Sequence, residues 1–246
     1  MKLAIGVIIV GSLYWDDQPH RKKWRNDRLQ MGKAIGAKLP IRYGRRSQSR
    51  GNTYTMVFSN GHQLGQAKAV PCARSVSCLE ELIDEAECLW AAEQPSNQNP
   101  DKKKRLSEKW GCIALLAHPS FQKTPGQELL RQLLDGWAKR VSLEGNYDDK
   151  NYNEPDGRCL VDNRGILQIP WPDRTDGSGP LPFDIVLATA TTPTPDSETQ
   201  DYHSASAVAQ AWKSDKNGHD KYFWRNRQHG IHTFQDEEIA KQLRAE

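Results

Sequence analysis

Apolar residues recur along this chain with two different periods, and the two periods predict the order of its elements. Short β-branched or alternating runs predict strands at residues 3–10, 39–43, 53–58, 65–71, 111–117, 165–170 and 183–192. Apolar positions three or four residues apart predict helices at residues 76–93, 127–141, 204–212, 222–227 and 236–244. Asn60-Gly61 predicts a hairpin between two of the strands, and Ser77 with Glu80 predicts a capping box at the start of the first helix.

Hairpin-like strands come first and most helices come later, so this order predicts an α+β fold rather than repeated βαβ units. We expect a mixed, partly closed, β-barrel-like sheet with inserted and C-terminal helices. Residues 1–145 would form the core, and residues 146–246 would add strands and the C-terminal helices to the same domain. Residues 146–157 are acidic and rich in turn formers, which predicts a flexible connection.

The composition narrows the class of protein. The hydrophobic fraction is only 37%, but eight tryptophans and patterned apolar runs in 246 residues favour a folded protein with a real core. The net charge of +3 does not by itself indicate a nucleic-acid partner. No run approaches the length of a membrane span, the N-terminal residues do not resemble a signal peptide, and five cysteines form no C-x-x-C pair. We therefore expect a cytoplasmic protein with reduced thiols and no membrane association.

The first predicted strand ends in the sequence Gly-Ser-Leu-Tyr-Trp at residues 11–15. A glycine there lets the backbone turn sharply or approach a ligand closely. The amide groups that follow and the Ser12 hydroxyl can then point together at an anion. The alternative interpretation is a core strand followed by an ordinary turn.

The helix predicted at residues 76–93 carries a carboxylate on its apolar side. Glu93 lies about 20° from Ala86, near the middle of the apolar stripe, and Glu85 lies at its margin. A buried carboxylate is costly unless it is paired or protonated, and in a cleft it suits a general acid or base. The alternative is that the helix frays before Glu93, so that this side chain reaches water.

Together these features resemble the γ-glutamylcyclotransferase-like proteins, over about residues 3–120. That family has Gly-Ser-Leu after a strand, its ChaC branch has an aromatic residue two positions after the Leu, and a catalytic Glu follows several tens of residues later. Residues 11–13, Trp15 and Glu93 take these places here, whereas Val10 stands where the family usually has Tyr. The second half of the chain carries no part of the resemblance.

The resemblance implies an enzyme of the amide-cleaving cyclase or transferase type. The substrate-binding residues would be Gly11, Ser12, Leu13 and Trp15, and the catalytic residue would be Glu93, with Glu85 as the next candidate. The Ser12 and Leu13 amides would hold the α-carboxylate of a γ-glutamyl group. Glu93 would move a proton from the α-amine to the leaving amine, and the product would be 5-oxoproline. This reaction is intramolecular, so no cofactor is expected.

Residues 20–50 contain eleven Lys or Arg and a single acid, Asp27, with Trp24 and Tyr43 among them. This pattern suits phosphate contacts with stacking, so nucleic-acid or nucleotide binding is the second functional hypothesis, behind a small-molecule ligand. Arg45 and Arg46 could equally clamp a small anionic substrate, and a charge run is most often a solvated face. A third hypothesis is an interaction protein whose cleft has lost its chemistry.

A metal site is not expected. His229 and His232 would have ligand spacing only in a helix, and Gly230 between them disfavours one.

Overall fold

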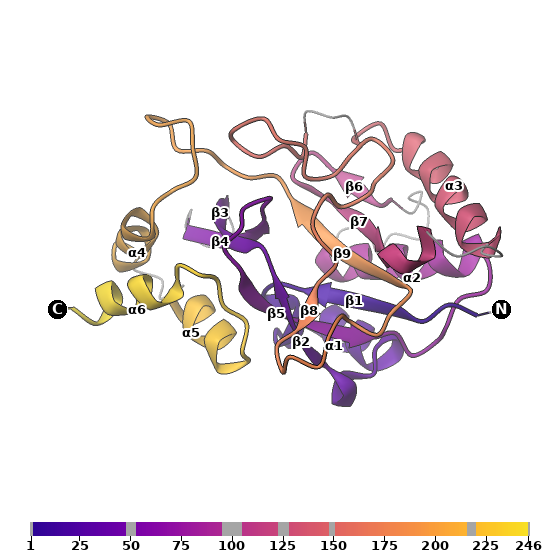
Figure 1. The fold of residues 1–246 in the computed structure, drawn as a ribbon. Coiled ribbons are helices and arrows are strands. Elements are labelled where there is room, and N and C mark those ends of the chain that lie inside the picture. Colours follow the sequence, from indigo (N-terminus) through magenta and orange to yellow (C-terminus); the bar gives the residue numbers. More distant parts are fainter. Residues whose placement is uncertain are drawn as a thin grey trace.

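The computed structural model describes residues 2–47, 53–94, 105–122, 128–147, 151–215 and 220–245. Its strands are β1 (Ile5–Ile9), β2 (Ile35–Leu39), β3 (Ile41–Ser47), β4 (Thr53–Phe58), β5 (Gly65–Pro71), β6 (Ser107–Glu108), β7 (Gly111–Ala117), β8 (Asp173–Arg174) and β9 (Ile185–Thr191). Seven of them form one mixed sheet in the order β6–β7–β9–β1–β5–β2–β8, and β3 pairs with β4 as a separate ribbon (Figure 1).

Six helices surround the strands in the described part of the chain: α1 (Pro19–Arg28), α2 (Leu79–Glu93), α3 (Glu128–Ser142), α4 (Ala205–Lys213), α5 (Asp220–Gln228) and α6 (Asp236–Arg244). Short 3-10 turns occur at η1 (Ser12–Tyr14), η2 (Met31–Lys33) and η5 (Pro119–Gln122). The C-terminal helices α4–α6 lie at one end of the molecule, and α3 lies at the other (Figure 1). Helix α2 packs between α1 and α3. None of these helices combines the length and apolar character that a membrane crossing requires.

Strand β1 lies inside the sheet and positions the turn that follows it. All five of its residues are buried, which explains why its sequence is a continuous apolar run. It pairs antiparallel with β5 and parallel with β9, where Ile8 lies opposite Ala188. Because β1 and β9 run in the same direction, the turn after β1 lies beside the end of β9. Thus β9, from the second half of the chain, lies between strands of the first half.

The α+β class with a mixed sheet and inserted and C-terminal helices is confirmed. Among the described strands, β6 and β8 remain as open edges, so their pairings do not close a barrel. The periodic runs at residues 53–58, 65–71 and 111–117 coincide with β4, β5 and β7.

Several local expectations were wrong. Pro40, which has no N–H for a ladder, divides the strand expected at residues 39–43 between β2 and β3. Residues 165–170 make only isolated bridges. Helix α2 begins after Cys78 rather than Ser77, and Ser77 donates to Glu81 instead of forming a box with Glu80.

The connection expected to be flexible at residues 146–157 is packed at Tyr147, Tyr152 and Glu154 and exposed at its end; residues 148–150 lie outside the described residues. Tyr147 is buried and donates its hydroxyl to the carbonyls of Leu106 and Ile113. Tyr152 is buried as well. The aromatic side chains thus anchor this segment against the β6–β7 edge.

Helix α1 has no counterpart among the expected elements. It begins with Pro19 in the first turn, where the missing N–H is harmless, and it buries Trp24. Apart from Pro19, Trp24 is its one apolar residue, so the helix shows no apolar stripe.

Candidate functional site

A cavity of about 90 Å³ lies where β1 passes into the turn at residues 11–15. It is small beside the roughly 300–1,000 Å³ of pockets that enclose drug-sized ligands. The described residues that line it come from eight parts of the chain: Ile8 to Leu13, Arg21, Arg45, Thr55 with Met56, Glu93, Trp110, Thr189 with Thr191, and Tyr222. The structure therefore brings together five residues that the sequence selected: Gly11, Ser12, Leu13, Arg45 and Glu93.

The turn itself is a single 3-10 turn. Tyr14 donates its backbone N–H to the Gly11 carbonyl, and Asp16 donates to the Ser12 carbonyl at 2.7 Å. The Ser12 and Leu13 amides come just before the first backbone N–H that donates within this turn, that of Tyr14. Two neighbouring N–H donors therefore belong to residues that line the cavity.

Gly11 serves a different purpose from the one its sequence position suggests. Its φ of −176° is extended backbone that any residue adopts. A Cβ at this position would lie 2.6 Å from the hydroxyl oxygen of Tyr222. The glycine therefore makes room for Tyr222 and is not required by a left-handed backbone.

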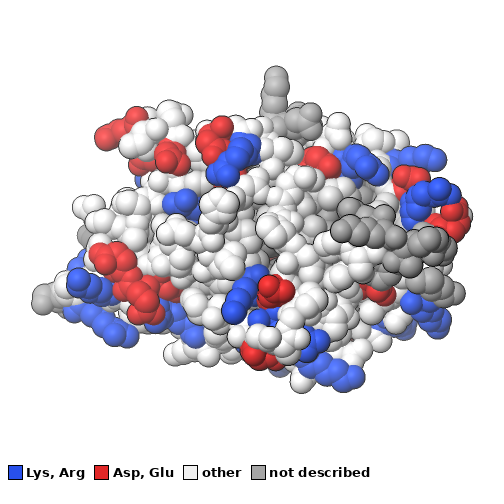
Figure 2. Space-filling view, in the orientation of Figure 1, with Lys and Arg blue, Asp and Glu red and all other residues white. Residues whose placement is uncertain are grey.

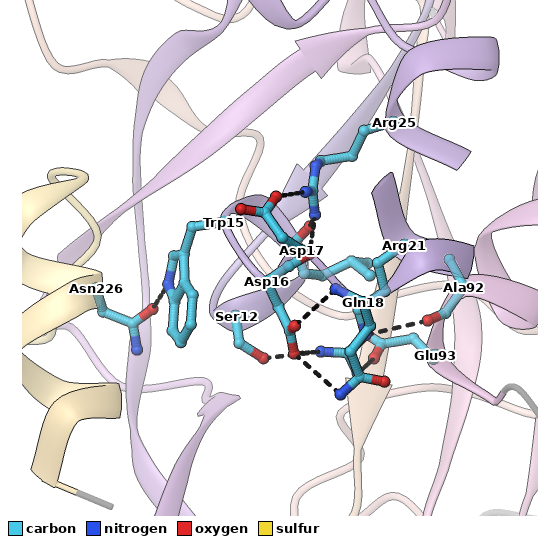
Figure 3. A network of polar contacts seen from close by, with 11 residues as sticks. Ser12, Trp15, Asp16, Asp17, Gln18, Arg21, Arg25, Ala92, Glu93 and Asn226 are labelled. Atoms are coloured by element: carbon cyan, nitrogen blue, oxygen red, sulfur yellow. Dashed lines mark hydrogen bonds and ion pairs between the residues drawn. The ribbon is translucent and has the colours of Figure 1, made fainter. Parts of the chain in front are cut away.

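Arg21, from α1, connects the turn to α2 (Figure 3). Its Nη1 donates to Ser12 Oγ at 3.1 Å and to Asp16 Oδ2 at 2.8 Å. Its Nη2 reaches Glu93 Oε2 at 3.4 Å, and its Nε donates to the Ala92 carbonyl at 3.3 Å. One guanidinium thus holds the hydroxyl of the turn and the carboxylate of α2 at the same cavity.

Arg25, one helical turn further along α1, holds the same turn from its backbone side. Its Nη1 donates to the carbonyls of Leu13 at 2.9 Å and Asp16 at 2.7 Å, and its Nη2 pairs with Asp17. Burial lowers the pKa of Arg25, and the carboxylates of Asp17 and Asp16 oppose that effect. These contacts fix the path of residues 13–17.

Glu93 is the last residue of α2, so the helix does not fray before it and the fraying alternative is wrong. Its side chain is 19% exposed and forms an ion pair with Arg21. The carboxylate on the apolar face is therefore accommodated by pairing at the edge of the cavity, as its cost in an apolar environment requires.

Glu85, the second catalytic candidate, is not among the residues that line this cavity. It is buried between α1 and α2 and forms an ion pair with Arg28 at 3.1 Å. Burial raises the pKa of Glu85, and Arg28 opposes the rise. Its position supports a role in joining the two helices.

Arg45 and Arg46 lie apart because successive residues of a strand point to opposite faces. Arg45 lines the cavity and lies over the ring of Trp110, 4.8 Å from its centroid. Arg46 instead donates its Nε to the Tyr54 hydroxyl. The two arginines therefore do not clamp one small ligand together, contrary to our expectation.

Trp15, the remaining predicted residue, is not among the lining residues, although its ring lies 6.2 Å from that of Tyr222, which is. Its indole N–H donates to Asn226 Oδ1 at 2.7 Å, in helix α5. Its contact is thus with the C-terminal helices rather than with a bound ligand.

Sequence reasoning missed several lining residues. Thr189 and Thr191 share one face of β9, and their hydroxyl oxygens are buried without a hydrogen-bond partner among the described residues. Trp110 stacks on Trp90 with the ring centroids 5.1 Å apart. Tyr222 comes from α5, more than two hundred residues after the turn. Only the alternation of β9 offers a local signal, because it places Thr189 and Thr191 on one side.

Most arginines of the basic segment are engaged inside the molecule. Arg21, Arg25 and Arg28 pair with carboxylates, and Arg42 lies over the ring of Tyr202 at 4.1 Å. On the face shown in Figure 2, basic and acidic side chains lie next to one another rather than in separate areas. Arg50 lies outside the described residues. Nothing in these contacts favours a continuous basic surface for a polyphosphate.

Within the described ranges, no group of three or more His, Cys, Asp or Glu side chains is arranged to hold a metal ion. Comparison of the chain with family models, with curated proteins and with solved structures found no match.

Proposed function

We propose that this protein binds a small amino-acid-like ligand beside residues 11–13 and cyclises a γ-glutamyl amide to 5-oxoproline, as γ-glutamylcyclotransferase-like enzymes do. One observation carries the proposal: Ser12 and Glu93 contact the same Arg21 guanidinium at one cavity. A turn with two neighbouring amides and a positioned carboxylate are the parts that this reaction needs.

The α-carboxylate of the ligand would bind to the Ser12 and Leu13 amides and to Arg21. Backbone N–H groups and a guanidinium are the donors that a carboxylate prefers, and hydrogen bonds to a charged acceptor are the stronger kind. The α-ammonium group would then face Glu93, which lies beside the Arg21 donors. An α-amino acid carries its carboxylate and its ammonium group on the same carbon. These two charges match the neighbouring Arg21 and Glu93, which carry the opposite charges.

The same contacts suggest how Glu93 becomes available as a base. Its contact with Arg21 is 3.4 Å long, whereas the Arg21–Asp16 contact is 2.8 Å. A bound α-carboxylate would compete for the Arg21 guanidinium and would release Glu93 toward the α-ammonium. Arg21 would thereby link ligand binding to the freeing of the catalytic carboxylate.

In the reaction, Glu93 takes a proton from the α-ammonium, and the resulting amine attacks the γ-carbonyl carbon. The new C–N bond closes the five-membered ring, the original amide C–N bond breaks, and Glu93 returns its proton to the leaving nitrogen. The attacking nitrogen loses a second proton as the ring amide forms, and the released amine takes up this proton. The products are 5-oxoproline and an amine in its ammonium form, with no water consumed. Holding the two reacting groups together supplies much of the rate.

The setting that fits this chemistry is the cytoplasm, where thiols stay reduced. All five cysteines are free thiols in the structure. The ligand we propose is a small molecule, and the proposal involves no cofactor.

The test is to incubate the purified protein with γ-glutamyl amides of amino acids and of simple amines, and to measure 5-oxoproline by chromatography. We expect Glu93→Gln to lower turnover by about 10²- to 10⁴-fold, because Gln keeps the shape but cannot take a proton. Glu85→Gln is the matched control, since it removes a carboxylate of the same helix outside the cavity. It should weaken the α1–α2 ion pair and leave turnover unchanged. Absence of 5-oxoproline with every amide, or an unaffected Glu93→Gln variant, would refute the proposal.

A further inference from the structure

Helix α5 packs against the turn at residues 11–15 on the side opposite α1. The Trp15 indole N–H donates to Asn226 Oδ1 at 2.7 Å (Figure 3), and the Arg225 guanidinium lies over the Trp15 ring. The Tyr14 ring meets the edge of His229, just beyond α5, with centroids 5.5 Å apart. The turn is therefore held between the arginines of α1 and the side chains of a helix from the C-terminal part of the chain.

The same helix also reaches the cavity. Tyr222 is only 6% exposed and is the one described lining residue that comes from the C-terminal helices. Its hydroxyl oxygen would lie 2.6 Å from a Cβ at residue 11, so any larger residue there would have to displace it. Helix α5 thus both supports the turn and forms part of the wall beside it.

The hydrogen bonding of the buried Asn226 side chain indicates that its role is to position the turn. Its side chain is fully buried, and the amide nitrogen Nδ2 has no hydrogen-bond partner in the part of the chain that the structure describes. A buried donor without a partner lowers stability, a cost that an apolar side chain of similar size would not bring. The carboxamide makes its hydrogen bond with Trp15, so what it adds is a fixed position for the turn.

We propose that α5 holds residues 11–15 in the conformation that binds a carboxylate, and that Trp15, Tyr222 and Asn226 are positioning residues of the site. The identity of the ligand, the α-carboxylate of a γ-glutamyl group, rests on the proposed function. Two amides can converge on one carboxylate only if the turn is held to within a fraction of an ångström. Helix α1 fixes the turn through Ser12 and the Leu13 carbonyl, and α5 fixes it through Tyr14, Trp15 and the space at Gly11.

The decisive variant is the double substitution Trp15→Phe/Asn226→Leu. Removing both partners leaves no buried donor or acceptor behind, so the denaturation midpoint in urea should stay close to that of the wild type. Hydrogen exchange at the amides of residues 14–16, which donate within the turn, should accelerate about tenfold or more while exchange in β1 and β9 stays the same. The Kd for L-glutamate, which has the α-carboxylate and α-amine but no amide to cleave, should rise about tenfold by calorimetry.

Two further variants keep the test interpretable. Trp224→Phe is the matched control, because Trp224 lies on the same helix but contacts Arg244 rather than the turn; it should change neither exchange in the turn nor Kd. Tyr222→Phe removes a single hydroxyl, so it should fold even if the double variant does not. It should raise Kd for L-glutamate about two- to tenfold.

The outcomes separate this inference from the proposed function. Faster exchange confined to the turn supports the role of α5 even if no γ-glutamyl amide is cleaved and L-glutamate does not bind, which would defeat only the proposed function. Unchanged exchange in the turn of a folded double variant would overturn the inference, as would a loss of affinity that Trp224→Phe reproduces.

Discussion

The Gly11→Ala substitution should damage the site through a single atom, the hydroxyl oxygen of Tyr222. Alanine adopts the extended φ of Gly11 readily, so the φ angle does not disfavour the substitution. The new Cβ would lie 2.6 Å from that oxygen, whereas ordinary contacts begin at 3.4 Å. If the hydroxyl is removed by Tyr222→Phe, the next atom of the ring lies 3.6 Å away, within the ordinary range.

Overpacking of this kind costs about 1–3 kcal/mol, and loss of the Tyr222 hydroxyl alone should cost about 0.5–1.5 kcal/mol. The combination Gly11→Ala/Tyr222→Phe should cost less than the two changes added together, with a coupling of about 1–2 kcal/mol. Urea denaturation of the four proteins measures each free energy of unfolding. Gly32→Ala is the control, because a Cβ there meets nothing within 4 Å. Additivity of the two changes to within about 0.5 kcal/mol would refute this account of Gly11.

Three other outcomes are expected. Arg45→Ala should weaken binding of an anionic ligand in the cavity, whereas Arg46→Ala should not, because of these two arginines only Arg45 lines the cavity. Neither variant should alter retention of labelled single-stranded RNA at low salt. Arg21→Lys should weaken binding of L-glutamate about tenfold in calorimetry despite the conserved charge, because an ammonium cannot contact Ser12, Asp16 and Glu93 as a planar fork does. Burial raises the pKa of Asp236 from 3.8 to about 6, with Thr233 and Arg227 opposing. A carboxyl with a higher pKa in the folded state destabilises that state once ionised, so the free energy of unfolding should fall by about 2 kcal/mol as pH rises from 4 to 6.5. Asp236→Asn should remove that fall, measured by urea denaturation across this pH range.

Elements that bury side chains at a regular period could be predicted from the sequence. Strands β4, β5 and β7 coincide with their predicted runs because every second or every residue is buried. Helix α6 coincides with its predicted range because its buried residues lie three and four positions apart, as on one face of a helix. The strand expected at residues 39–43 failed because one residue, Pro40, outweighs the apolar pattern around it. Residues 165–170 are apolar enough for a strand, yet they form only isolated bridges, which depends on neighbours that a local pattern does not contain.

In the candidate site, likewise, some residues could be predicted from the sequence and others could not. Gly11, Ser12 and Glu93 could be selected because each departs from a local rule: a glycine at the end of a buried strand, a polar turn after it, a carboxylate on an apolar face. Tyr222 departs from no rule in its own segment, since an aromatic residue in an amphipathic helix is ordinary core. Its place at the cavity follows from the packing of α5 on the turn, which no sequence period encodes.

The basic segment shows that the spacing of charged residues is more informative than their number. Arg21, Arg25 and Arg28 are four and three residues apart, so they lie on one face of α1, and each is wholly or largely buried against an acceptor. Lys22 and Lys23, off that face, are exposed. Arginines spaced three and four residues apart are therefore consistent with a helix whose basic face is buried against carboxylates. Here these carboxylates belong to the turn and to α2. That arrangement explains why a helix without an apolar stripe is held in place, and why its first arginine reaches both Ser12 and Glu93.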